Sequence, residues 1–177
     1  MINKDNIISI EKLLNNKKIV RSEYLSDSFG INCIKIFTND SNKYVVKFYK
    51  ERNTKFNAIK SETENLIFFQ KNKIKFFPIV QNKDNNFLIM SFIDNNEKLP
   101  KETKEDFLNA IISIHEKKSN KYGFDFDTQI GGLKQINKKS NNWVDFYRDY
   151  RLAYIYELIN KYEPMDFKIN KKIELLL

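Results

Sequence analysis

Two charged residues in the first half of the chain have the types and spacing of a buried ion pair. In a predicted strand that is otherwise apolar, Lys47 shares one face with Val45. Glu62 lies three residues after Ile59 and four before Leu66, which places its carboxylate on the apolar face of a predicted helix. Because a buried charge without a partner costs several kcal/mol, we expect Lys47 and Glu62 to pair between the sheet and the helix. The alternative is that Lys47 extends to solvent at a sheet edge and Glu62 faces water.

A strand lysine held by a helix glutamate, followed by further strands and a short linker, is how a protein-kinase-like N-terminal lobe binds ATP phosphates. In that arrangement the backbone at the end of the next long strand, here Met90, Ser91 and Phe92, contacts adenine. A plain core strand fits the same three residues equally well. Residues 26–32 lie where a loop covering the phosphates is expected, but this segment has only one glycine.

Hydrophobic periodicity predicts an α+β fold. The predicted elements of the first 93 residues are a helix over 5–15, strands over 31–38 and 43–49 joined by a turn, a helix over 54–71, an extended segment at 79–80 and a strand over 87–93. A short polar linker follows at 94–98, and then helices over 100–118 and 143–162, a break at Pro164 and a last helix. Residues 119–142 show no periodicity, which predicts an irregular connection. We therefore expect a nucleotide-binding N-lobe over 1–93 and a linker with an incomplete helical C-lobe over 94–177.

Composition narrows the classes of partner. The chain has 177 residues with 41% hydrophobic residues and one cysteine, which excludes a disulfide scaffold. No window approaches the roughly 18 apolar residues of a membrane span, so we expect a cytoplasmic protein with no membrane partner. The net charge is +8, but only four of the 31 cations are arginine and the favoured residues share A/T-rich codons. Because phosphate-reading surfaces favour arginine, the composition disfavours nucleic acid as the main partner.

Two segments of the second half resemble a known family. Residues 122–137 read Y-G-F-D-F-D-T-Q-I-G-G-L-K-Q-I-N, and residues 142–152 read N-W-V-D-F-Y-R-D-Y-R-L. They are similar to the fructosamine kinase (ketosamine 3-kinase) family, whose patterns read F-G-F-x-x-D-N-x-I-G-x-x-P-Q-x-N and W-x-x-F-F-x-x-x-R-L. Upstream, the family's G-G-x-I-N loop, F-V-K strand, E-x-x-x-L helix and L-x-x-L-H helix fall on residues 28–32, 45–47, 62–66 and 111–115. The resemblance runs from about residue 20 to the end.

The resemblance implies a protein-kinase-like fold and an activity that depends on ATP and Mg²⁺. The reaction it implies is phosphorylation of the third-carbon hydroxyl of a ketosamine, either a small molecule or a glycated protein lysine. It implies that Lys47 binds the α- and β-phosphates and that Glu62 orients Lys47. The residues of the implied ATP site are Lys47, Glu62, Asn32, Met90, Ser91 and Phe92. Motif residues that receive no role are His115, Asp125, Asp127, Gly131, Gln135, Asn137, Trp143 and Arg151.

The chain departs from the family pattern in two ways. Ser28 and Phe29 replace glycines of the phosphate loop, and Ser91, Thr128 and Lys134 replace an acidic residue, an asparagine and a proline. The family's catalytic loop, H-G-D-x-x-x-x-N, and its magnesium aspartate belong to the second half of the family's chain, and this sequence stops before them. We therefore expect no catalytic residue and no metal ligand here. The expected product is a truncated chain that is inactive alone and that aggregates, pairs or is completed by a second chain; the alternative is a non-catalytic kinase-like module that binds nucleotide or a partner.

Three motif residues have plainer interpretations. Arg151 is expected to cover Tyr147 and Tyr154 with its stem, and the alternative is a pair with Asp125 or Asp127. His115 is expected to pack on its helix rather than to transfer protons. Trp143 and the tyrosines that follow it at helical spacing are expected to form core rather than a platform for a sugar.

Overall fold

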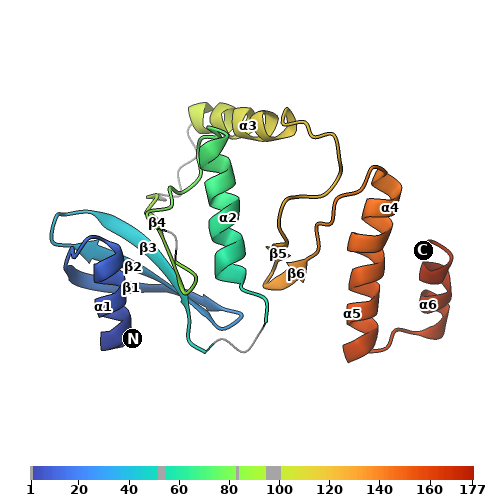
Figure 1. Ribbon diagram of the computed structural model, residues 1–177, viewed down its shortest axis with the longest axis horizontal. Coiled ribbons are helices and arrows are strands. Elements are labelled where there is room, and N and C mark those ends of the chain that lie inside the picture. Colours follow the sequence, from blue (N-terminus) through green and yellow to red (C-terminus); the bar gives the residue numbers. More distant parts are fainter. Residues whose placement is uncertain (1, 52–54, 83, 95–100) are drawn as a thin grey trace. The chain divides into compact units, whose positions relative to one another are not determined.

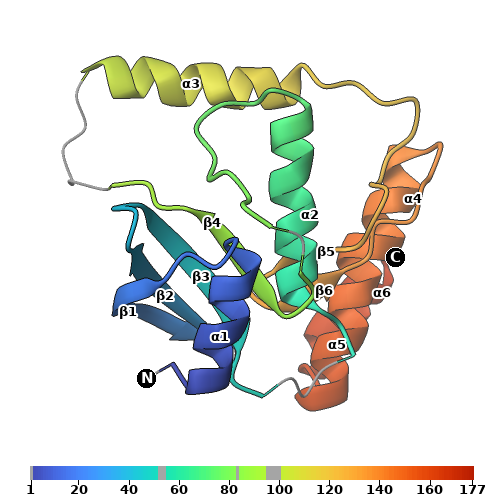
Figure 2. The same ribbon diagram turned by 60° about the vertical axis from the view of Figure 1, so that its left-hand side comes forward.

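The computed structural model describes residues 2–51, 55–82, 84–94 and 101–177 (Figures 1 and 2). The chain divides into two compact units, Met1–Lys117 and Lys118–Leu177. The elements of the first unit are α1 (Lys4–Leu13), β1 (Ile19–Ser28), β2 (Ile31–Thr38), β3 (Lys43–Tyr49), α2 (Ala58–Lys71), β4 (Phe87–Ser91) and α3 (Lys101–His115). Those of the second unit are β5 (Thr128–Ile130), β6 (Leu133–Gln135), α4 (Trp143–Tyr147), the π-helical segment η1 (Arg148–Ala153), α5 (Tyr154–Tyr162) and α6 (Phe167–Glu174).

The first unit is built on a four-stranded antiparallel sheet in the order β1-β2-β3-β4. Strand alternation sends two sets of apolar side chains to opposite faces, and each set packs against its own helix. One core cluster joins Ile10 and Leu14, from α1 and the residue after it, to Ile34, Ile36, Val46 and Ile89 of the sheet. The other joins Ile59 and Leu66 of α2 to Val45, Leu88 and Met90. We call this second surface the α2 face of the sheet.

The structure confirms the predicted strands β2 and β3 within their predicted bounds, and it corrects the order of elements around them. The strand β1 was not predicted, and residues 79–80 contribute only an isolated bridge, Val80 to Met90. The order after α1 is therefore β-β-β-α-β rather than β-β-α-β-β. Helix α2 begins at Ala58, where the Asn57 side chain caps it by accepting a hydrogen bond from the Lys60 N–H at 3.1 Å. The predicted start at Thr54 lies outside the described residues.

In the second unit, residues 119–142 are not wholly irregular. They contain the antiparallel hairpin β5–β6, whose turn residues Gly131 and Gly132 have φ of 52° and 80°. The segments α4, η1 and α5 then form one continuous helix with the predicted bounds 143–162, although its wide π-helical middle was not predicted. The predicted lobe boundary near Ile93 and the cytoplasmic location both stay predictions. Within the described ranges, no helix has the length and apolar character needed to cross a membrane.

Candidate functional site

The Lys47 ammonium donates a hydrogen bond to Glu62 Oε1, and the two atoms lie 2.6 Å apart. The side chains are 27% and 24% exposed, so the pair is neither sealed in the core nor bathed by solvent. This confirms the predicted pairing of the strand lysine with the helix glutamate. It contradicts the alternative in which both residues extend separately into water.

The sheet and α2 explain why the pair forms here. Lys47 lies opposite Cys33 of β2 and Leu88 of β4, in the middle of the α2 face. On α2, Ile59 and Leu66 are buried on that face, and Glu62 lies between them. An ammonium has three N–H donors and Glu62 Oε1 accepts one of them. With about a quarter of its side chain exposed, Lys47 suits a ligand rich in acceptor oxygens, such as a phosphate.

Cys33, the only cysteine of the chain, is a half-buried neighbour of Lys47 on the same face. Burial raises the pKa of the Cys33 thiol, and the positive charge of Lys47 opposes that rise. The thiol is therefore mostly neutral at pH 7 and adds no negative charge beside the ammonium.

The other residues predicted for ATP binding do not all gather around Lys47. Asn32 lies opposite Phe48, which packs in the α1 cluster, so Asn32 lies on the other face of the sheet from Lys47. Met90 lies on the α2 face, but its side chain is 8% exposed and belongs to the core. Within this set, Lys47 and Glu62 are joined by a hydrogen bond, while Met90 and Phe92 belong to the apolar cluster of the α2 face.

The backbone of the predicted adenine segment already has protein partners. The N–H of Ser91 donates to the Ile79 carbonyl at 2.9 Å, and the Ser91 hydroxyl accepts from the Ile79 N–H at 2.9 Å. The N–H of Phe92 donates to the Lys43 carbonyl across a longer 3.4 Å. These two N–H groups are therefore engaged within the protein, and the contact of this backbone with adenine stays a prediction.

The predicted phosphate loop is a tight two-residue turn between β1 and β2. Phe29 and Gly30 both have positive φ, 53° and 73°, and Phe29 is 69% exposed. The Lys50 N–H donates to the Gly30 carbonyl at 3.0 Å, and Lys50 also forms an ion pair with Asp27. The segment therefore lies in a turn between β2 and the unpredicted strand β1, and Lys50, the residue after β3, bonds to its backbone.

The motif residues of the second unit form a hydrogen-bond network centred on Asn137, which is 5% exposed. The Asn137 N–H donates to Asp127 Oδ1 at 3.0 Å, and its side-chain amide donates to the Phe126 carbonyl at 3.1 Å and to Thr128 Oγ1 at 2.8 Å. The Thr128 hydroxyl in turn donates to Gln135 Oε1 at 2.9 Å. This network ties the ends of the β5–β6 hairpin together, which indicates a structural role for Asp127, Gln135 and Asn137.

Arg151 joins η1 to this network. Its guanidinium donates to Asn137 Oδ1 at 2.6 Å and to the Ile136 and Tyr150 carbonyls at 2.7 and 2.8 Å. Burial lowers the pKa of Arg151, and Tyr147 opposes that shift. The guanidinium also lies 4.7 Å from the centroid of the Phe146 ring. Arg151 therefore differs from the predicted stem cover of Tyr147 and Tyr154, because its charged end is committed to hydrogen bonds.

The two aspartates that were weighed as partners of Arg151 each form a lysine pair. Asp125 pairs with Lys139 at 3.0 Å and is 83% exposed, and Asp127 pairs with Lys134 at 2.7 Å. Burial by itself raises the pKa of the Asp127 carboxyl, but hydrogen bonds from Lys134 and the Asn137 N–H hold that pKa below its ordinary value of 3.8. Lys134, which stands where the family has proline, thus gains a partner.

The remaining motif residues are structural or exposed. Trp143 packs against Tyr122, Phe146 and Tyr147 with ring centroids 5.4 to 6.0 Å apart. The expectation that Trp143 and the tyrosines after it form core is wrong, because Trp143, Tyr147 and Tyr162 are 51%, 44% and 76% exposed. Gly131 forms the β5–β6 turn. His115 ends α3 and is exposed, which differs from the expectation that it packs on its helix.

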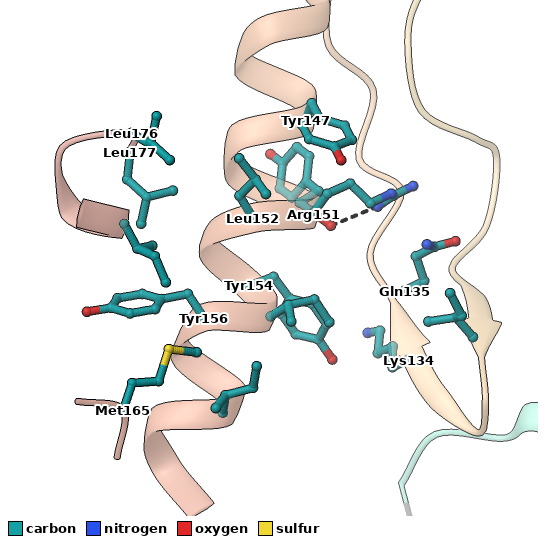
Figure 3. Close-up of a pocket in the computed structure, with 15 residues that line it drawn as sticks. Lys134, Gln135, Tyr147, Arg151, Leu152, Tyr154, Tyr156, Met165, Leu176 and Leu177 are labelled. Atoms are coloured by element: carbon teal, nitrogen blue, oxygen red, sulfur yellow. Dashed lines mark hydrogen bonds between the residues drawn. The ribbon is translucent and has the colours of Figure 1, made fainter. Parts of the chain in front are cut away.

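The second unit also has a hollow of about 430 Å³ (Figure 3). Its walls come from the β5–β6 hairpin, η1, α5 and α6, and most of the side chains that line it are aliphatic or aromatic. Its polar lining residues include Lys134, Gln135 and Arg151, all of which are engaged in the interactions described above. The hollow is therefore mainly apolar, because Lys134, Gln135 and Arg151 already have partners within the second unit.

In residues 2–51, 55–82, 84–94 and 101–177, no group of three or more His, Cys, Asp or Glu side chains could hold a metal ion. The sequence analysis did not single out Lys35 of β2, which lies on the α2 face. Residues 31, 33 and 35 alternate onto the same face of β2, and Cys33 lies opposite Lys47, so the sequence could have placed Lys35 there.

Comparison with known proteins identifies the family. The sequence model described as fructosamine kinase matches residues 7–175. The chain belongs to the fructosamine kinase family. It is 32% identical over 71 residues to the chloroplastic protein-ribulosamine 3-kinase of Arabidopsis thaliana, a match that covers 39% of this chain and 21% of that protein.

Solved structures of members assigned to this family share the fold. Crystal structures of proteins assigned as fructosamine-3-kinases from Haemophilus somnus 129PT and Thermobifida fusca YX-ER1 match with TM-scores of 0.77 and 0.75 at 18% and 16% identity. Each match covers 96% of this chain, but 58% and 60% of those chains. An aminoglycoside phosphotransferase with bound ADP matches with a TM-score of 0.60 at 19% identity, over 98% of this chain and 56% of that one. These likenesses confirm the predicted α+β, protein-kinase-like fold. The chain spans about three fifths of the length of the two fructosamine-3-kinase structures.

Proposed function

We propose that this chain contributes the nucleotide-phosphate grip of an ATP-dependent ketosamine kinase. The observation that carries the proposal is the 2.6 Å pair between Lys47 and Glu62. Lys47 binds the α- and β-phosphates of ATP with the donors that Glu62 leaves available, and Glu62 fixes the direction in which the ammonium points. Family membership over residues 7–175 supports phosphoryl transfer as the reaction class. The acceptor is the third-carbon hydroxyl of a ketosamine, on a small molecule or on a glycated protein lysine.

We propose that adenine binds at the Phe92 end of the α2 face. Since the Ser91 and Phe92 N–H groups have protein partners, the base contacts the Phe92 side chain and the carbonyl groups that follow β4. Met90 and Ser91 contribute by fixing that strand end, one through the core and the other through its two hydrogen bonds to Ile79. The nucleotide-binding lobe is accordingly proposed to be residues 1–93. Asn32 contributes at most through the β1–β2 turn, because it lies on the other face.

We also propose that these 177 residues bind nucleotide without transferring phosphate. The H-G-D-x-x-x-x-N pattern, whose aspartate accepts the hydroxyl proton in the family's scheme, does not occur in the sequence. In this proposal the base and the Mg²⁺ ligands come from residues outside these 177, and a second chain is one source of them. Magnesium bound there would neutralise charge on the phosphates that Lys47 holds.

The test is nucleotide binding by the purified chain, measured by calorimetry with and without Mg²⁺, together with an assay for γ-phosphate transfer to a fructosyl amine. We expect ATP to bind, and Lys47→Ala to weaken binding about 10- to 100-fold through loss of charge-assisted hydrogen bonds. The matched control is Lys60→Ala, an exposed lysine of α2, which we expect to change ATP affinity less than twofold.

Two results would contradict the proposal. If wild type and Lys47→Ala bind ATP equally well, Lys47 does not bind the phosphates. If the chain alone phosphorylates the fructosyl amine, the proposal that it binds nucleotide without transferring phosphate is wrong. The non-catalytic alternative differs in one respect. It predicts that supplying the missing half of a homologous enzyme never restores transfer, whereas our proposal predicts transfer that is lost with Lys47→Ala.

A further inference from the structure

Lys35 is a second cation on the α2 face of the sheet, and nothing in the proposed ATP site yet uses it. It lies opposite Val45 of β3, and Val45 lies opposite Met90 of β4. The row that contains Lys47 is the next row along the same face. The Lys35 side chain is only 15% exposed, which is unusual for a residue that is mostly found at the surface.

Two aromatic rings and one carboxylate surround the Lys35 ammonium. Its nitrogen lies 3.9 Å from the centroid of the Phe92 ring, 4.9 Å from that of Phe37 and 3.8 Å from Glu23 Oε2. Glu23 also forms a shorter ion pair with Arg21, whose guanidinium nitrogen lies 2.8 Å from Glu23 Oε1, so its attraction to the lysine is weak. Because the ammonium is largely desolvated, its attraction to the Phe92 ring is stronger than that of an exposed cation.

Phe92 packs against the core cluster of the α2 face, and its backbone is held by a long hydrogen bond. It lies one residue beyond the end of β4, and its N–H reaches the Lys43 carbonyl across 3.4 Å, near the upper limit for a hydrogen bond. Lys43 and Lys47 are four residues apart on β3, so the Phe92 end of the face is about 13 Å from the phosphate grip. That separation is comparable with the reach of a nucleotide from its base to its phosphates.

We propose that Lys35 is a positioning residue that holds Phe92, the first residue after β4, in place for the base of the nucleotide. This inference rests on the proposed function, since it assigns the base end of the same site. Lys35 itself need not touch the nucleotide. Its effect therefore falls on the affinity for the base and not on the affinity for the phosphates, in contrast to that of Lys47.

The experiment measures three ligands by competition with a fluorescent ATP analogue: ATP, adenosine and inorganic tripolyphosphate. In Lys35→Met, which keeps the apolar stem and removes the charge, we expect adenosine and ATP to lose affinity by the same factor, about three- to tenfold. Tripolyphosphate should be unchanged. Lys35→Arg should restore adenosine affinity, because a guanidinium also stacks on an aromatic ring. The matched control is Lys60→Met, which removes an exposed lysine from α2 and should change none of the three.

A second measurement does not depend on nucleotide. Hydrogen exchange in the free chain should be faster at the Phe92 N–H in Lys35→Met than in wild type, while exchange at β3 stays the same. Unchanged adenosine affinity in Lys35→Met, or equal losses for adenosine and tripolyphosphate, would overturn the inference. If Lys47→Ala still weakens ATP in that case, the proposed function stands and only the role of Lys35 fails. If wild type binds none of the three ligands, both fail together.

Discussion

Arg151 and Asn137 are joined by a 2.6 Å hydrogen bond from the guanidinium to Oδ1, which links η1 to the residue two positions after β6. Each is also bonded to other parts of the hairpin segment, Arg151 to the Ile136 carbonyl and Asn137 to Asp127 and Thr128. The motif that makes the second unit recognisable as a fructosamine kinase is therefore a set of residues that bind one another. These bonds hold the β5–β6 hairpin against the helix formed by α4, η1 and α5.

Replacing Arg151 should destabilise the second unit. In Arg151→Met the Asn137 oxygen and the Ile136 carbonyl lose their donor, and a buried acceptor left without a partner costs about 1–3 kcal/mol. The measurement is the free energy of unfolding in urea. The control is Arg148→Met on the same helix, whose exposed pairs with Asp145 and Asp149 should contribute less than about 1 kcal/mol. If the two variants lose the same free energy of unfolding, the hydrogen bond from Arg151 to Asn137 contributes no more to stability than the exposed ion pairs.

Gly123 should tolerate no side chain. Its φ is +100°, and a Cβ there would lie 2.5 Å from the Lys138 carbonyl oxygen and 2.9 Å from that of Asn137. Both obstacles are backbone atoms, so Gly123→Ala should lower the free energy of unfolding by about 2–4 kcal/mol. Gly30→Ala is the control, because φ is +73° and the nearest atom to its Cβ, the Glu51 carbonyl oxygen, is 4.0 Å away. That change should cost about 1–2 kcal/mol from the left-handed backbone alone. A Gly123→Ala chain as stable as Gly30→Ala would mean that this close approach does not exist.

Asp127 should make the second unit sensitive to acid. Its pKa in the folded chain is below the ordinary 3.8, so the unfolded chain takes up the proton first as pH falls. The stability that the carboxylate contributes is thus fully present above about pH 4 and is lost as pH falls through the lowered folded pKa. Asp127→Asn should be less stable than wild type at pH 7 and should lose less stability between pH 5 and pH 3. Asp125→Asn, which changes an exposed aspartate, should keep the wild-type pH dependence, and a match between the two variants would contradict this role.

The sequence predicted the parts of the fold in which strand-forming composition and turn residues agree. Strands β2 and β3 are rich in β-branched and aromatic residues and flank a turn of Asn, Asp and Ser, so their bounds were correct. Strand β1 was missed because most of its ten residues are exposed, and an edge strand without a buried face has no hydrophobic pattern. The hairpin β5–β6 was missed because two three-residue strands are too short to show a period.

The site could be predicted where the position of a residue on one face of a strand or helix determines its neighbours. Alternation along β3 and helical spacing along α2 brought Lys47 to Glu62, and the structure agrees. The same alternation along β2 was not followed to Lys35, and it contradicts the placing of Asn32 with Lys47. The partners of Arg151 could not be read from spacing, since they depend on how a π-helical turn directs the side chain toward a loop. Backbone partners of Ser91 and Phe92 were equally hidden, because tertiary pairing decides them.

The most direct test of the phosphate grip is the ATP affinity of Glu62→Gln. This variant removes the charge that holds Lys47 while keeping the shape of the side chain, so the ammonium loses its fixed direction but not its own charge. We predict ATP binding about 3- to 30-fold weaker than wild type, with adenosine affinity unchanged. Glu64→Gln, two residues along α2, should bind ATP as wild type does. If Glu62→Gln and Glu64→Gln bind ATP equally well, the pair between Lys47 and Glu62 is not the grip on the nucleotide.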